Sequence, residues 1–150
     1  DNAGLIVGRP DDEVRKALEA QGVTCEEFAF TDSNDVSSVA QKAADFSDVV
    51  YIPTDNTAAS CAEAIKGAAT KPIVAGEEGI CKGCGVATLS ISYYDLGVTT
   101  GKMAAKILTG ESKVEEMPIE YAPEFTKEYN PTIAEALGIT IPDDYVAYEG

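Results

Sequence analysis

Short apolar runs alternate with amphipathic stretches from the start of the chain to about residue 108, and this alternation limits the fold more than any other feature. Five runs have the length and composition of buried strands: 3–7, 25–30, 49–52, 72–75 and 86–91. Each run is followed by a segment with the apolar spacing of a helix. Strands that alternate with helices form a parallel sheet with right-handed crossovers. The sequence therefore predicts an α/β fold, a doubly wound parallel sheet with helices on both faces.

Residues that begin or end helices separate these runs. Asp11 and Asp12 suit the first turn of a helix because carboxylates oppose its dipole, and Gly22 is expected to end that helix. Ser33 or Asn34 is expected to cap the second helix through its side-chain oxygen. Three further helices are expected over residues 56–69, 77–82 and 94–108.

The alternation loosens after Glu111. Asn130 followed by Pro131 predicts the start of a last helix, because proline fits the first helical position, and Gly138 predicts its end. Residues 139–148 are either a last helical turn or a tail. Two stretches have the composition of short strands or extended segments, 119–121 and 125–129.

Composition excludes several classes of function. The 150 residues carry 11 basic and 26 acidic side chains, a formal charge of −15, which argues against nucleic acid and anionic membrane surfaces as partners. Histidine is absent, so imidazole acid–base chemistry and histidine-bound metals are excluded. No apolar run approaches the ~20 residues that a membrane-spanning helix needs. The length fits one domain or a piece of a larger protein, and no cofactor or metal is predicted.

Four cysteines, Cys25, Cys61, Cys81 and Cys84, are too few for a disulfide scaffold. Cys81 and Cys84 have the C-x-x-C spacing, but a structural zinc site needs four ligands and a redox site needs its first cysteine at a helix N-terminus. The pair is expected in a glycine-rich turn before a strand. We interpret both as small structural residues, with a local disulfide, or a redox or metal role, as less favoured alternatives.

Ligands of open parallel sheets bind where the strands end at their carboxyl termini, and three loops occupy such positions here. The first carries Thr54, Asp55, Asn56 and Thr57 after the third strand. The free amides at the start of the next helix suit a carboxylate or another small polar group. Asp55 or Asn56 is also well placed to do no more than cap that helix, and ligand contact is slightly favoured over capping alone.

The other two loops offer carboxylates and aromatic rings. Glu77 and Glu78 follow the fourth strand, where they could act as an acid and a base, bind a cation, or lie solvated in a first helical turn. Tyr93 and Tyr94 follow the fifth strand and offer flat apolar faces for stacking, although packing is the simpler role for at least one of them. No phosphate-binding loop, dinucleotide-binding fingerprint or nucleophile elbow occurs, so the sequence shows no evident catalytic machinery.

Several segments, taken in order, resemble the signature segments of one family. The main ones are DVVYIPTDNT (48–57), PIVAGEEG (72–79), YYDLG (93–97) and GKMAAKIL (101–108). Shorter matches extend the likeness from about Leu5 to Pro142. The chain resembles the ABC-transporter substrate-binding proteins of the tryptophan/tyrosine-binding type, which have the type I periplasmic-binding-protein fold. It departs from the family pattern at Cys81, Cys84 and Ser92, which puts a ligand contact by Ser92 in doubt.

This resemblance implies a particular domain organisation. Such proteins have two lobes hinged around the ligand, and residues 1–150 correspond to the region of the C-terminal lobe. Within it, residues 1–92 are expected to form one α/β lobe, and residues 93–150 a crossover helix and a C-terminal segment. The family also implies an exported, extracytoplasmic protein that is anchored to the membrane as a lipoprotein through a cysteine upstream of this chain.

The resemblance further implies a binding protein and no enzyme: a module that captures a small molecule, an aromatic amino acid, and delivers it to the membrane permease of an ABC importer. Asp55 would face the ammonium group of the ligand, and its neighbours would donate and accept hydrogen bonds. Glu77 would line the pocket or orient a neighbour, and Tyr93 would stack on the ligand or close the rim. The residues expected at the ligand are Thr54, Asp55, Asn56, Thr57, Glu77 and Tyr93.

Two other functions remain open at this point. A response-regulator-like or flavodoxin-like signalling domain shares the α/β order, but it needs clustered carboxylates or a phosphate loop after the first strand, and residues 8–10 supply neither. An enzyme that uses Glu77 and Glu78 ranks third. Because the helix over 94–108 is rich in apolar residues, it should be covered when the first lobe is missing, either by folding back onto its own sheet or by pairing or swapping with a second copy. We favour the second outcome, a homodimer.

Overall fold

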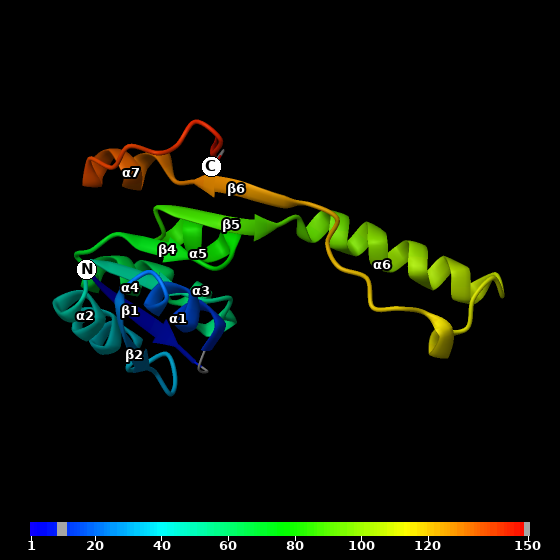
Figure 1. Cartoon of the computed structure of the whole chain (residues 1–150), viewed down its shortest axis with the longest axis horizontal. Helices are drawn as coiled ribbons and strands as arrows, with labels where there is room; N and C mark the ends of the chain where they lie inside the picture. The colour runs from blue at the N-terminus through cyan, green and yellow to red at the C-terminus, as the bar shows by residue number, and fades with distance from the viewer. Residues whose placement is uncertain (9–11, 149–150) are drawn as a thin grey trace.

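A computed structural model describes residues 1–8 and 12–148, and one mostly parallel sheet is its centre (Figure 1). The sheet order is β2-β1-β3-β4-β5-β6-β7. In chain order, the strands are β1 (Asn2–Val7), β2 (Thr24–Ala29), β3 (Val49–Ile52), β4 (Ile73–Ala75), β5 (Ala87–Ile91), β6 (Phe125–Tyr129) and β7 (Val146–Ala147). The strands β1 to β5 pair in parallel, β6 is antiparallel to β5, and β7 is parallel to β6. The predicted α/β fold is confirmed, with an antiparallel edge added to it.

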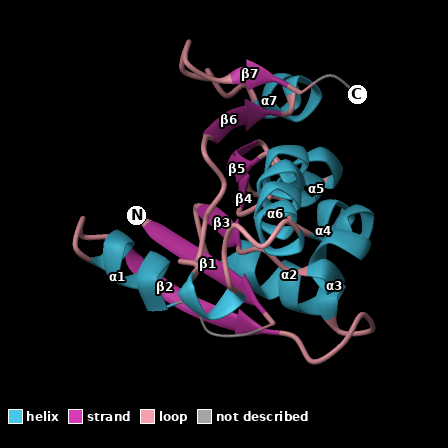
Figure 2. Ribbon diagram, turned by 90° about the vertical axis from the view of Figure 1, so that its right-hand side faces the viewer, coloured by secondary structure: helices cyan, strands magenta, loops and turns pink. Residues whose placement is uncertain are grey.

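Helices cover both faces of this sheet, as predicted (Figure 2). In the described part of the chain they are α1 (Asp12–Glu19), α2 (Val36–Phe46), α3 (Asn56–Ser60), α4 (Ala62–Ala68), α5 (Glu78–Gly83), α6 (Tyr93–Leu108), the 3-10 helix η1 (Val114–Glu116) and α7 (Pro131–Leu137). Figure 2 shows α1 on one face and α2 to α5 on the other. The expected helix start at Asp11 lies outside the described residues. Beyond α1 the first face stays open, so Val74 and Leu89 are 38% and 55% exposed.

The core lies between the sheet and α2 to α5. Leu5 and Ile6 of β1 are fully buried, as the continuous apolar run predicts for a strand covered on both faces. A Cβ on Gly4 would lie 3.0 Å from Ser47 Oγ and 3.1 Å from the Ala43 carbonyl, so only glycine lets α2 approach β1 this closely. Burying each large apolar side chain of this core, such as Leu5 or Ile6, stabilises the fold by about 1.5–3 kcal/mol.

The helix expected over residues 56–69 is in fact two helices, α3 and α4, which meet at Cys61. The Ser60 hydroxyl donates to the Thr57 carbonyl at 2.8 Å, and the Cys61 N–H donates to both the Thr57 and the Ala58 carbonyl at 3.1 Å. A serine that bonds the backbone of the preceding turn competes with the regular helix and bends it. This contact depends on a side-chain rotamer, which explains why the apolar spacing did not reveal it.

The cap expected for α2 at Ser33 or Asn34 is also wrong, because the helix begins one residue after Asp35. The Asp35 carboxylate points back to the preceding loop, where it accepts hydrogen bonds from the N–H groups of Thr31 and Asp32 at 3.1–3.3 Å. The side chain therefore stabilises the turn that enters α2 and makes no hydrogen bond to the first turn of the helix.

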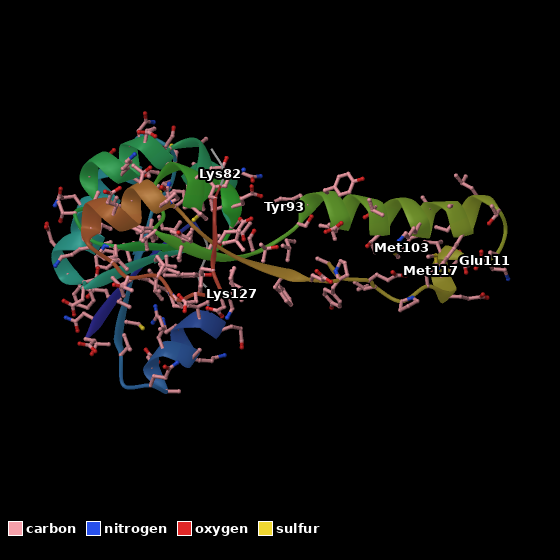
Figure 3. The ribbon with its side chains drawn as sticks, turned by 90° about the horizontal axis from the view of Figure 1, so that it is seen from above. Lys82, Tyr93, Met103, Glu111, Met117 and Lys127 are labelled. Carbon is pink, nitrogen blue, oxygen red and sulfur yellow. The ribbon has the colours of Figure 1, made fainter. Side chains whose placement is uncertain are left out.

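Residues 93–124, which we call the arm, leave the sheet after β5 and return to it at β6 (Figure 1). Its helix α6 projects away from the sheet, with Tyr93 at its base and Met103 farther out, and contains no buried residue (Figure 3). We call the remaining described residues, 1–8, 12–92 and 125–148, the body. The two parts of the chain therefore differ in how much packing they have.

The end of the chain adds two strands and a helix to the body. Asn130 caps α7 by accepting the Ile133 N–H at 3.2 Å, Pro131 occupies the first turn, and Gly138 ends the helix in the left-handed conformation (φ 64°). This confirms the predicted helix at both ends. The stretch 139–148, expected as a helical turn or a tail, instead contains β7, which pairs with β6.

Candidate functional site

The loops after β1, β3, β4 and β5 meet at one edge of the sheet, because parallel strands point their carboxyl ends the same way. A hollow of about 490 Å³ opens there between the end of β1 and the start of α3. Its lining residues are Gly8, Thr54, Asp55, Asn56 and Thr57. We call it the β1–β3 hollow, and it contains four of the six residues that the sequence predicted at the ligand.

Asp55 has two roles in this hollow, one for each carboxylate oxygen. Its Oδ1 caps α3 by accepting hydrogen bonds from the N–H groups of Thr57 at 2.8 Å and Ala58 at 2.9 Å. Its Oδ2 faces the end of β1, where a Cβ on Gly8 would lie only 2.6 Å away. No hydrogen bond from the described residues reaches Oδ2, so this oxygen is available to a donor in the hollow.

Thr54 holds the loops after β3 and β4 together. Its hydroxyl donates to the Gly76 carbonyl at 3.1 Å, and the Gly76 N–H donates to the Ile52 carbonyl at 2.7 Å. A Cβ on Gly76 would lie 2.8 Å from Pro53 Cα, so glycine is required where the two loops cross. The floor of the β1–β3 hollow is therefore fixed by the backbone of β3 and β4.

Glu77 lies outside this hollow, at the start of α5. Its carboxylate accepts hydrogen bonds from the N–H groups of Gly79, at 2.8 Å, and Ile80. The neighbouring Glu78 forms an ion pair with Lys82 one turn later. Both carboxylates thus have structural partners, and Glu77 fits the role of fixing α5 beside the loop better than the role of an acid or base.

Tyr93 lines a second hollow, of about 400 Å³, at the base of the arm. We call it the α6-base hollow, and its wall combines hydroxyl groups with carboxylates. Its lining residues are Glu78, Ser90, Ile91, Ser92, Tyr93, Tyr94, Asp95, Thr126 and Glu128. Ser92 caps α6 by accepting the Asp95 N–H at 3.1 Å, which gives its hydroxyl a structural use. Tyr93, 52% exposed, is therefore not brought together with Asp55 in one hollow.

Sequence reasoning missed Thr126 and Glu128 of this hollow because they belong to β6. Thr126 pairs with Ser90 and Glu128 pairs with Thr88, so the antiparallel register turns all four side chains to one face. Burial raises the pKa of the Glu128 carboxyl, and the nearby charge of Glu78 raises it further. The alternation within residues 125–129 could have suggested this face, but only the register shows which strand lies opposite.

The two cysteines of the C-x-x-C spacing lie in α5 and at its end, where the sequence had suggested a turn. Cys81 and Cys84 are free and buried, and burial is the main reason that each has a pKa of about 12. A thiol that stays protonated at neutral pH is a poor nucleophile and a poor metal ligand. Among the described residues, no group of three potential metal ligands comes together.

None of the described helices combines the length and the hydropathy that crossing a membrane requires.

Comparison with known proteins adds the decisive observation. A family model described as ABC transporter substrate binding protein matches residues 10–149. The chain belongs to this family. The resemblance drawn from the segments around residues 48–57 and 72–79 is thereby confirmed, and the family of ABC transporter substrate-binding proteins is one of solute-binding proteins.

A relative among well-characterised proteins is the tyrosine-binding protein of Clostridioides difficile (strain R20291). It is 36% identical over 75 residues, which are 48% of this chain and 21% of that protein. Part of this substrate-binding protein thus matches a protein named for tyrosine binding.

Three solved structures superpose on nearly the whole chain. An ABC domain from Streptococcus pneumonia, solved in complex with L-Trp, has a TM-score of 0.82 at 27% identity and covers 98% of this chain. A conserved domain protein from Vibrio cholerae O1 biovar El Tor has a TM-score of 0.87 at 27% identity and covers 99%. A substrate-binding protein with adhesive properties from Clostridium difficile, in its ligand-free open form, has a TM-score of 0.72 at 29% identity and covers 99%. The chain spans 54–56% of the length of these structures.

Proposed function

We propose that this chain forms one wall of a two-lobe binding protein that captures an aromatic amino acid outside the cytoplasmic membrane and delivers it to the permease of an ABC importer. The observation that carries the proposal is the β1–β3 hollow, with Asp55 Oδ2, which accepts no hydrogen bond from the described residues, and the polar side chains of Thr54, Asn56 and Thr57. An ammonium group is the ligand feature that best matches such a carboxylate oxygen beside hydroxyl and amide groups. The names of the tyrosine-binding relative and the L-Trp complex support an aromatic amino acid.

The proposal gives each of the other two candidate residues a part in the cleft. Glu77 orients the loop after β4 by capping α5, and Tyr93 closes the rim from the start of α6. In this arrangement residues 1–92 form the lobe that faces the ligand, and residues 93–150 comprise the crossover helix and the C-terminal segment. Anchoring as a lipoprotein belongs to the same proposal and is supported by family membership alone.

The arm supplies the surface for the other half of the binding protein. Tyr94, Leu108 and Ile119 are 80%, 86% and 81% exposed, which is unusual for large apolar side chains in a stable monomer. We propose that the first lobe covers this surface in the two-lobe protein and that a second copy covers it in the isolated chain. Sedimentation of this chain should show a dimer at micromolar concentration, and a monomer under the same conditions would contradict the second part.

A matched pair of substitutions tests the role of Asp55 in the two-lobe protein. Asp55→Asn keeps a good N-cap for α3 but removes the charge, whereas Asp55→Ala removes both. A charge-assisted hydrogen bond contributes about 1.5–3 kcal/mol, so calorimetry with L-Trp and L-Tyr should show about 10- to 150-fold weaker binding for both variants. Unchanged affinity in Asp55→Asn would exclude an ammonium contact, and Glu63→Gln on the exposed face of α4 is the control that should bind normally.

The chain alone should bind the same ligand poorly, because it offers one wall of the cleft and the remaining ligand surface stays in water. A thermal-shift screen with amino acids and sugars should give small shifts for the chain and a clear shift with aromatic amino acids for the two-lobe protein. Tight binding by the chain alone would contradict the one-wall arrangement. A signalling role of the response-regulator or flavodoxin kind gains no support from the family match.

A further inference from the structure

A third hollow, of about 200 Å³, lies between α4 and α7 at the opposite edge of the sheet. Its lining residues are Lys66, Ala69, Lys71, Ile73, Cys84, Thr132, Ile133, Ala136 and Leu137. Ile73 is the first residue of β4, whereas Thr54 to Thr57 follow the last residue of β3. This α4–α7 hollow is therefore separate from the hollows at the carboxyl ends of the strands.

The inner wall of the α4–α7 hollow is apolar and formed by buried residues. Ile73 and Cys84 are 2% and 3% exposed and belong to the core, and burial keeps the Cys84 thiol protonated with a pKa of about 12. Ala69, Ile133 and Leu137 complete an apolar surface. An apolar cavity of about 150 Å³ is large enough to hold benzene. The hollow therefore has room for one aryl or branched-alkyl group.

The position of α7 keeps this hollow open. The Asn130 side-chain amide donates to the Cys81 carbonyl at 3.4 Å and to the Lys82 carbonyl at 3.1 Å, while its oxygen caps α7. The start of α7 is thus tied to the end of α5. Ala134 is the buried residue of α7. The residues after it, Ala136 and Leu137, line the hollow, so this part of the helix does not fill the gap to α4.

The rim carries two positive charges. Five described basic residues form ion pairs with carboxylates: Arg15, Lys16, Lys82, Lys113 and Lys127. Lys66 and Lys71 form none with the described residues, although the chain has 26 acidic side chains. Lys66 and Cys84 both line the hollow, and the pKa of the Cys84 thiol, raised mainly by burial, is also raised by the charge of Glu63 and lowered by that of Lys66. Two cations that form no ion pair with the described residues, beside an apolar hollow, complement an anion that carries an apolar group.

We propose that the α4–α7 hollow binds a small amphiphilic carboxylate, whose aryl or branched-alkyl group lies on Ile73 and Cys84 and whose carboxylate lies beside Lys66 and Lys71. The site is independent of the proposed amino-acid cleft. Because the ligand is small and the hollow is half open to water, binding is weak, with a Kd of about 1–10 mM.

Titration of the ¹⁵N-labelled chain with sodium phenylacetate tests this site. The amides of Ile73, Cys84 and Ile133 should shift in a saturable way, and those of Thr54 to Thr57 should not. Benzyl alcohol, which has the same ring without the charge, should bind at least about 3-fold more weakly. No saturable shift at about 50 mM phenylacetate, or saturable shifts confined to Thr54 to Thr57, would overturn the proposal.

Substitutions separate the contribution of the lysine charges to phenylacetate binding from that of the apolar wall. Lys66→Gln and Lys71→Gln should each weaken phenylacetate binding about 2- to 5-fold, because Lys66 is exposed and Lys71 is only half-buried, so water screens both charges. Lys42→Gln on α2 is the matched control, since Lys42 is exposed like Lys66 and forms no ion pair with the described residues but does not line the hollow. Ala136→Phe should fill the hollow and abolish the saturable shifts while the dispersed spectrum of a folded chain remains. Normal binding in Ala136→Phe, or in a variant that combines Lys66→Gln and Lys71→Gln, would show that phenylacetate binds elsewhere.

Discussion

The body and the arm contain similar proportions of apolar residues but bury them differently. In the body, α2 and α4 bury Val36, Ala40, Ala43 and Ile65 completely against the sheet. In the arm, α6 is twice as long as α1 and has no buried residue. An apolar helix is therefore not enough to form a core, because burial also needs a second surface within reach.

In this chain, the helical conformation of α6 is stabilised by interactions within the helix itself. Ser92 caps its first turn, Asp95 lies near its positive end and Lys106 near its negative end. Gly97 and Gly101 oppose these effects, since glycine costs about 0.8–1.0 kcal/mol per residue inside a helix. Helices of about this length are marginal in water without tertiary contacts. The arm and the body should accordingly respond very differently to the same measurement.

Hydrogen exchange gives the largest expected contrast. Amides of β1 and β3 should exchange only through global unfolding, which for a domain with 5–15 kcal/mol of stability means protection by about 10⁴-fold or more. Amides of α6 should show little protection when the chain is dilute and monomeric. Mass spectrometry of peptides from the two regions measures both values. Protection of α6 that appears only as the protein concentration rises would identify the second copy as its partner, whereas strong protection at every dilution would contradict the comparison.

Truncation of one apolar side chain in each region gives the next largest contrast. Ile65→Ala should lower the free energy of unfolding by about 2–5 kcal/mol, because Ile65 is fully buried and its loss leaves a cavity. In the dilute, monomeric chain, Leu108→Ala should change it by less than about 0.5 kcal/mol, because Leu108 is 86% exposed. Urea denaturation followed by tyrosine fluorescence measures both. Equal effects would mean that the arm packs on the body.

Alkaline pH should lower the free energy of unfolding of the body, because the body contains two buried thiols. The pKa values of Cys81 and Cys84 are about 12 in the folded chain against 9.0 without burial, so between these values the folded state holds protons that the unfolded state has lost. The free energy of unfolding should therefore be fully maintained below pH 9 and fall as the pH rises toward 12, by at most about 1.4 kcal/mol per pH unit for each thiol.

Denaturation at several pH values in this range, with Cys84→Ala compared with Cys61→Ala, isolates this contribution. The decline should be shallower in Cys84→Ala and unchanged in Cys61→Ala, because Cys61 is only half-buried. An identical decline in both variants would assign it to other groups, such as Lys82, whose pKa is raised mainly by its hydrogen bond to Glu78.

Glycine substitution in the arm gives the smallest effect. A Cβ on Gly97 or Gly101 would meet nothing within 4 Å, so alanine should fit and should stabilise α6 by about 0.5–1 kcal/mol per site. Far-ultraviolet circular dichroism should show more helix, while the urea midpoint of the body stays the same. A fall in helix content would indicate that another surface already lies against these glycines.

The same contrast explains what the sequence could predict. Five strands and the α/β class follow from runs such as 3–7 and 49–52, because a strand with at least one buried face needs apolar residues close together in the sequence. The strand β7 leaves no such mark, since it has two residues, both exposed, and exists through its pairing with β6. The break between α3 and α4 depends on one hydroxyl of Ser60.

The residues of the candidate site also differ in how far the sequence could predict their position. Thr54 to Thr57 are adjacent in the chain, so their meeting in the β1–β3 hollow was predictable once β3 was placed. Bringing Tyr93 and Glu77 to the same point requires the positions of two further loops, and in this chain neither lines that hollow. Glu128 was invisible to sequence reasoning because its place opposite Thr88 depends on how the chain returns from the arm.

Because β5 pairs with β6, the arm is an insertion between two neighbouring strands of the sheet. Ile91 and Phe125 are register partners, and five such pairs hold the two strands together as the strands of a hairpin. Residues 92–124 are then its loop, and the entropy of closing a loop changes only slowly with its length. Evolution can lengthen, shorten or redesign this loop without shifting a single pair of the ladder. A turn of two residues between Ile91 and Phe125 would leave a minimal domain with every strand in place.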